Sequence, residues 1–202
     1  MIAVRSNPWL WIAMAFCASL GLVISILGFF GDEERGVRIA LHATARLAFL
    51  FFWPAYVGGA LTSLFGDLFL PMRRHARELG LAFAAALLVH LGLVVRLCAM
   101  GSPPSPKTFV IFGVAAGFTY LLAVLSVDCF RQAVPSKFWP ILRTAAMTYI
   151  AFAFILDFKR LPLSDFGQSL EYLPFAALSI IAPLLRVAAW AQTLGCKLRM
   201  PV

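Results

Sequence analysis

The sequence predicts an all-α, polytopic membrane protein that is built as a bundle of six transmembrane helices. Three observations carry this prediction. Of the 202 residues, 62% are hydrophobic and only 13% are charged, whereas about a quarter of the residues of a soluble domain are charged. The mean hydropathy of the chain is +0.90. Several apolar runs also reach about 20 residues, which is the length that a helix needs to cross a bilayer.

Each apolar run ends at a short segment of Pro, Gly and charged residues, which is typical of a turn between helices. The segments are GDEERG, LPMRRHARE, GSPPSPK, RQAVPSK and KRLPLSDFGQS. None is long enough to be a soluble domain, so we expect residues 1–202 to form a single transmembrane domain. The expected spans are, in order, Pro8–Phe30, Val37–Leu61, Leu79–Cys98, Phe109–Val127, Ile141–Phe158 and Tyr172–Leu194.

The first run exceeds the 7–15 apolar residues of a signal peptide, and no A-x-A-like cleavage site follows it, so we interpret it as a retained helix. Lys and Arg then set the expected orientation. The side that holds both chain ends carries nine of these residues between or beside the spans: Arg5, Arg73, Arg74, Arg77, Arg131, Lys137, Arg143, Lys197 and Arg199. The other side carries six: Arg35, Arg38, Arg96, Lys107, Lys159 and Arg160. This asymmetry predicts that both ends lie in the cytoplasm.

Three of the polar side chains that lie within apolar runs indicate a site. His42 and Arg46 are one turn apart on the second expected span, so they share a helix face. His90 lies on the third span, about 16 Å along the axis from Leu79. If neighbouring spans run in opposite directions, His42 and His90 reach comparable depths. Because a charge in hydrocarbon is costly, such groups usually face a cavity or a partner, and we expect all three to face inward around one site.

Neutral imidazole is a ligand of haem iron, and guanidinium matches a carboxylate such as a haem propionate. His90 is therefore the candidate ligand of a haem iron, His42 a less certain second ligand, and Arg46 a candidate propionate partner. A histidine that hydrogen-bonds a neighbouring helix explains the same residues without a cofactor. No HExxH, Gly-x-Ser-x-Gly or pair of carboxylates within a span points to hydrolysis, and we expect no catalytic side chain and no nucleic-acid partner.

Two stretches resemble the ferric reductase-like transmembrane domain family. RELGLAF begins at Arg77 and is followed by His90, ten residues after its glycine. HATARLAF begins at His42 and is similar to the His-x-Thr-Gly-Arg-x-Ala-Leu pattern of the haem-binding membrane subunits of the bacterial methionine sulfoxide reductase system, with Ala45 in place of the glycine. The resemblance covers roughly residues 37–160. It implies a b-type haem between facing histidines in a bacterial inner membrane, and electron transfer from a quinol, or from a flavin on a partner, to an outer-side acceptor or a partner reductase.

The chain departs from that family on the fifth expected span. The family pattern Trp-x-x-Leu-His matches Trp139 and Leu142, but Arg143 stands at the first histidine position and Leu156 at the second. Met147 is the alternative axial ligand on this span. Three interpretations stay open: a haem protein that would be an oxidoreductase subunit, a haem-less relative that serves as a membrane scaffold or a quinone- or lipid-binding subunit, and an unrelated six-helix membrane protein.

Overall fold

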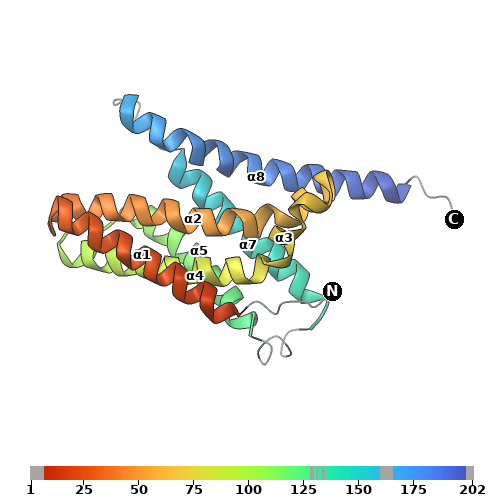
Figure 1. The fold of residues 1–202 in the computed structure, drawn as a ribbon, viewed down its shortest axis with the longest axis horizontal. Helices are drawn as coiled ribbons and strands as arrows, with labels where there is room; N and C mark the ends of the chain where they lie inside the picture. The colour runs from red at the N-terminus through yellow and green to blue at the C-terminus, as the bar shows by residue number, and fades with distance from the viewer. Residues whose placement is uncertain (1–6, 128–129, 131, 133–134, 160–165, 199–202) are drawn as a thin grey trace. The chain divides into compact units, whose positions relative to one another are not determined.

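The computed structural model describes residues 7–127, 130, 132, 135–159 and 166–198. All regular structure in these residues is helical (Figure 1). The helices are α1 (Pro8–Phe30), α2 (Glu34–Phe65), a single 3-10 turn η1 (Asp67–Phe69), α3 (Leu70–Arg74), α4 (Ala76–Ala99), α5 (Pro106–Leu125), α7 (Phe138–Phe158) and α8 (Phe166–Leu198).

Six of the described helices are long and apolar enough to cross a membrane: α1, α2, α4, α5, α7 and the part of α8 from Tyr172 to Leu194. This confirms the all-α prediction of a multi-pass membrane protein with six spans. The orientation stays a prediction, and four of the residues on which it rests, Arg5, Arg131, Arg160 and Arg199, lie outside the described residues.

Helix α2 is longer than its expected span. At its first turn, Arg38 Nε donates a hydrogen bond of 2.8 Å to Glu34 Oε1, and this i,i+4 pair supports a helical turn ahead of the apolar run. The helix continues through Pro54. It ends before Gly66, whose φ of 81° lies in the left-handed region that glycine adopts without strain.

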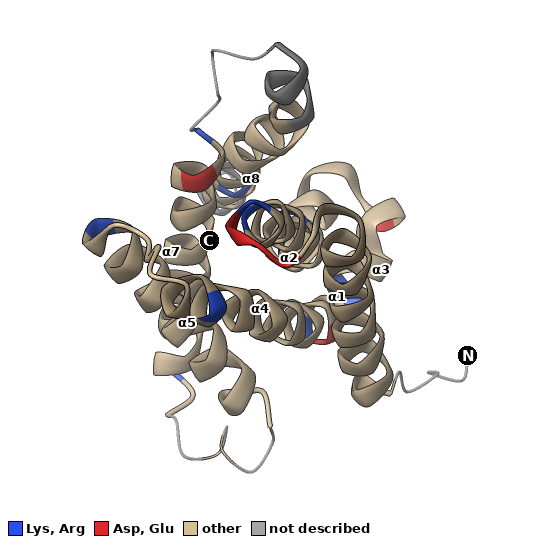
Figure 2. Cartoon of the chain, turned by 90° about the vertical axis from the view of Figure 1, so that its left-hand side faces the viewer, with Lys and Arg blue, Asp and Glu red and all other residues tan. Residues whose placement is uncertain are grey.

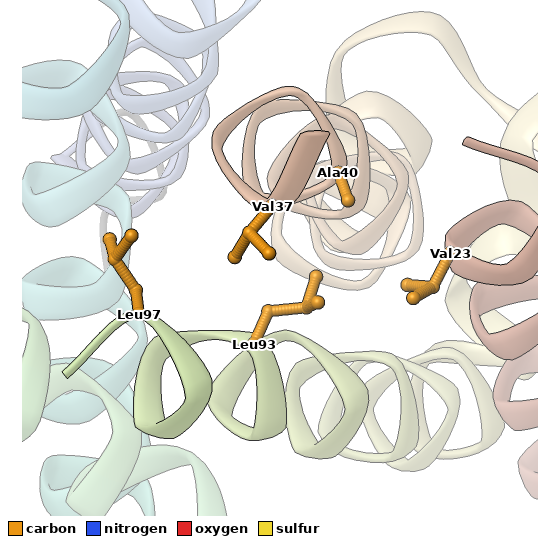
Figure 3. Packing of buried hydrophobic residues seen from close by; sticks show 5 residues of the cluster. All are labelled: Val23, Val37, Ala40, Leu93 and Leu97. Atoms are coloured by element: carbon orange, nitrogen blue, oxygen red, sulfur yellow. The ribbon is translucent and has the colours of Figure 1, made fainter. Parts of the chain in front are cut away.

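The chain divides into two compact units, and α2 contributes to both. The first unit comprises residues Met1–Phe52 and Arg77–Gly113. Its core lies where α1, α2 and α4 meet, and Figure 3 shows Val37 of α2 and Leu93 of α4 pointing toward each other, with Val23 of α1 beside them. At the end of α4, Arg96 forms an ion pair with Asp32 of the α1–α2 turn; a cation in a last helical turn also interacts favourably with the helix dipole.

The second unit comprises Trp53–Ala76 and Val114–Val202. The indole Nε1 of Trp53 donates a hydrogen bond of 3.0 Å to the backbone carbonyl of Leu178, which joins α2 to α8. Phe158 of α7 is 1% exposed and contacts Phe175 of α8, with 5.6 Å between the ring centroids. In both units charged side chains occupy only short parts of the helices (Figure 2), and α1 carries none.

Candidate functional site

His90 of α4 contacts α2 through Thr44. The His90 Nδ1 atom and the Thr44 hydroxyl oxygen are 3.0 Å apart. Thr44 is 1% exposed, and its hydroxyl also lies 2.8 Å from the backbone carbonyl oxygen of Ala40, one turn earlier. The first unit therefore contains a part-buried polar contact between two apolar helices.

The contact indicates which ring nitrogen of His90 carries the proton. A threonine hydroxyl has one proton to donate, and inside a helix it commonly donates to the carbonyl four residues earlier. The Thr44 oxygen then accepts a hydrogen bond from His90 Nδ1–H. The tautomer is inferred from this network, and it leaves the Nε2 lone pair of His90 available.

His42 and Arg46 lie on a different side of α2 from Thr44. Each is two residues from Thr44, which is about 160° around a helix of 3.6 residues per turn. The His42 side chain is exposed and the Arg46 side chain is half-buried with its Nε atom buried. The side chain of α2 that contacts His90 is Thr44, which in the sequence stands out only as part of the family-like motif.

The contact between Thr44 and His90 involves the Nδ1 atom of the imidazole, so Nε2 is the atom through which His90 would hold a haem iron. His42 as the second haem ligand stays a prediction. Met147 lies in the second unit. Among the described residues, no group of three or more His, Cys, Asp and Glu side chains is placed to hold a metal ion.

The second unit contains a cavity of about 500 Å³ between α2, α3, α7 and α8. Three arginines line it: Arg73 of α3, Arg143 of α7 and Arg186 of α8. Its other polar lining includes the side chains of Ser63, Thr144 and Thr193, and its apolar lining includes Ala60, Met147, Ala189 and Trp190. None of the fifteen described lining residues is acidic. The cavity is thus a positively charged pocket with an apolar wall.

Two close contacts shape this cavity. Gly58 of α2 lets α3 approach, because a Cβ atom at this position would lie 3.0 Å from the backbone carbon of Met72 and 3.1 Å from the backbone nitrogen of Arg73. The guanidinium carbon of Arg186 of α8 lies 4.5 Å from the centroid of the Tyr56 ring of α2. This is a cation–π contact, and it holds the charge of Arg186 at the cavity wall.

In the sequence, these arginines have separate explanations. Arg73 is one of the basic residues that set the expected orientation, and Arg143 is a departure from the family pattern. Arg186 is an arginine inside an apolar run, and that signal alone makes a residue a functional candidate. Their convergence is visible only in the structure. No family model, no curated protein and no solved structure matches this chain.

Proposed function

We propose that this chain is a multi-pass membrane protein that binds an amphiphile, of the lipid or quinone class, in the cavity between α2, α3, α7 and α8. The single observation that carries the proposal is that cavity. Its volume of about 500 Å³ is within the range of small-molecule sites, and its lining combines arginines with an apolar wall. This corresponds to the haem-less interpretation of the sequence.

The position of the cavity within the spans favours a ligand that comes from the bilayer. Apart from Arg73 of α3, its lining residues belong to the last part of α2, the first residue of α4, the first part of α7 and the last part of α8. Because consecutive spans alternate in direction, these helix ends lie at the same membrane face.

Filling the cavity is expected to remove the ligand. Ala189 is buried in the cavity wall, so Ala189→Phe would occupy ligand space. Ala188 is the neighbouring residue and is exposed, which makes Ala188→Phe a matched control. The measurement is mass spectrometry of lipids and quinones extracted from the purified full chain. We expect Ala189→Phe to lose a species that the wild type and Ala188→Phe retain. Equal recovery of all species from the three proteins would reject the proposal.

The second candidate function is haem-based electron transfer, and the Thr44–His90 contact favours it. A histidine that ligates a metal usually donates its other ring N–H to an acceptor, which fixes its orientation. His90 would hold the iron through Nε2, while Thr44 would keep the ring in place. A bound haem would supply one-electron transfer, as the resemblance to ferric reductase-like proteins implies. The donor would be a quinol or a partner flavin, and the chain would lie in a bacterial inner membrane.

This second function makes a spectroscopic prediction. If haem is bound, the dithionite-reduced protein shows a sharp absorption band, and His90→Ala abolishes it because the ligand is lost. Thr44→Val should lower haem affinity about 10–100-fold, because it removes the hydrogen bond that orients the ligand. Arg46→Ala should weaken haem retention without abolishing ligation. His75→Ala is the control, since His75 lies outside the spans. A colourless wild type from haem-replete cells would exclude this candidate.

A further inference from the structure

We infer that the ligand of the cavity is an anionic phospholipid whose phosphate group is bound by Arg73, Arg143 and Arg186. The inference rests on the proposed function, since it names the class of amphiphile that the cavity takes. It also separates that class from the quinones, whose head groups carry no charge. Three features of the cavity support it: its charge, the placement of Arg186 and the combination of lining groups.

The charge of the cavity selects for an anion. Three guanidinium groups border a space of about 500 Å³, and no described lining residue is acidic. Guanidinium presents a planar fork of donors that binds phosphate oxygens in pairs, and such charge-assisted hydrogen bonds are about twice as strong as neutral ones. A neutral carbonyl head group offers acceptor atoms but no negative charge. A phosphate diester offers both the negative charge and the acceptor atoms that match them.

Arg186 lies inside a candidate span, where a charge is costly. It is eight residues from the end of the span at Leu194, or about 12 Å along the helix axis. The side chain is half-buried, and its guanidinium lies over the ring of Tyr56, which is 5% exposed. The contact with Tyr56 keeps the charge directed at the cavity. An anion in the cavity would compensate a charge that is unfavourable in hydrocarbon.

The remaining lining matches the rest of a lipid. Ser63, Thr144 and Thr193 offer hydroxyl groups that can bond the polar part of a head group or its glycerol. Met147 and Trp190 provide the apolar wall against which acyl chains can pack. Basic pockets between transmembrane helices are known to bind anionic head groups. The bilayer is accordingly the source of the ligand, and free inorganic phosphate lacks the apolar part that this wall accommodates.

The inference is tested by ligand-induced thermal stabilisation of the full chain in a neutral detergent. The probes are dioleoylphosphatidylglycerol, dioleoylphosphatidylcholine, a short-chain quinone and inorganic phosphate. Both phosphatidylglycerol and phosphatidylcholine carry the phosphate diester, but the choline ammonium of the latter would place a further positive charge beside three arginines. We therefore expect phosphatidylglycerol to bind at least about tenfold more tightly than phosphatidylcholine, because repulsion between like charges at close range is sufficient for such a ratio. Arg186→Gln should remove that preference. Arg143→Gln is expected to reduce the same preference. It provides the test if Arg186→Gln does not give a monodisperse protein.

A matched pair of variants separates the cavity from general surface charge. Arg73 lines the cavity, whereas Arg74 is its exposed neighbour on α3 and does not. Arg73→Gln should weaken phosphatidylglycerol binding, and Arg74→Gln should leave it unchanged. Equal losses in both variants would overturn the inference, as would equal binding of phosphatidylcholine or equal stabilisation by inorganic phosphate. Binding of the quinone alone would overturn the inference while leaving the proposed function intact, and binding of neither amphiphile would reject both.

Discussion

Replacing Phe158 by alanine is expected to lower the stability of the protein by an amount near the lower end of about 3–5 kcal/mol, the range for deleting a buried phenylalanine ring in a soluble core. Phe158 is 1% exposed. It stacks on Phe154 at a centroid distance of 5.9 Å and an interplanar angle of 11°, and it contacts Phe175 of α8. The truncation would leave a cavity between α7 and α8.

The physical origin of this cost differs from that in a soluble core. Lipid tails are as apolar as a phenylalanine ring, so transfer out of water contributes little to helix association in a membrane. What is lost is the packing of the ring against its neighbours, because a void has no atoms to provide dispersion contacts. The measurement is the midpoint of unfolding of the purified protein, followed by circular dichroism in one detergent.

Phe152 provides the control on the same helix. Its side chain is 49% exposed, so Phe152→Ala should change stability by no more than about 0.5 kcal/mol, the usual range for a surface substitution. A midpoint for Phe158→Ala equal to that of Phe152→Ala would show that the Phe154–Phe158–Phe175 stack does not hold α7 against α8.

Gly58→Leu is expected to have the second largest effect, because it forces α3 away from α2. Even the Cβ atom would lie 3.0 Å from the backbone carbon of Met72, and a backbone atom cannot move aside as a flexible side chain can. Overpacking of this kind costs about 1–3 kcal/mol. Since α3 carries Arg73, the same substitution should lower phosphatidylglycerol binding at least as much as Arg73→Gln does.

The control is Gly80→Leu on α4, where a Cβ atom would have no neighbour within 4 Å. Both substitutions replace a helical glycine by a strong helix former, which by itself favours the helix by up to about 1 kcal/mol. We therefore expect Gly80→Leu to keep or raise the unfolding midpoint and Gly58→Leu to lower it. If Gly58→Leu retained full lipid binding, the close approach of α2 and α3 would not be what positions Arg73.

The sequence by itself determined the six spans. The length of an apolar run can be read directly from the sequence, and a run of about 20 residues matches the thickness of a bilayer. The expected spans Pro8–Phe30 and Tyr172–Leu194 agree fully with the candidate spans, and the other four begin within three residues of the helices observed. Charged flanks could still extend a helix beyond its apolar run, as Glu34 and Arg38 do in α2.

Only the tertiary structure decided which side of each span faces a neighbouring helix. In a soluble helix a polar face marks the outside, but a span is apolar all round and offers little such contrast. From the sequence, His42 and Arg46 therefore suggested that their own face of α2 is the one that meets α4. In the structure, α4 contacts the face of α2 that carries Thr44, and there Thr44 contacts His90. The cavity depended on tertiary structure for the same reason. Arg73, Arg143 and Arg186 belong to three different helices, and only packing brings them to one cavity.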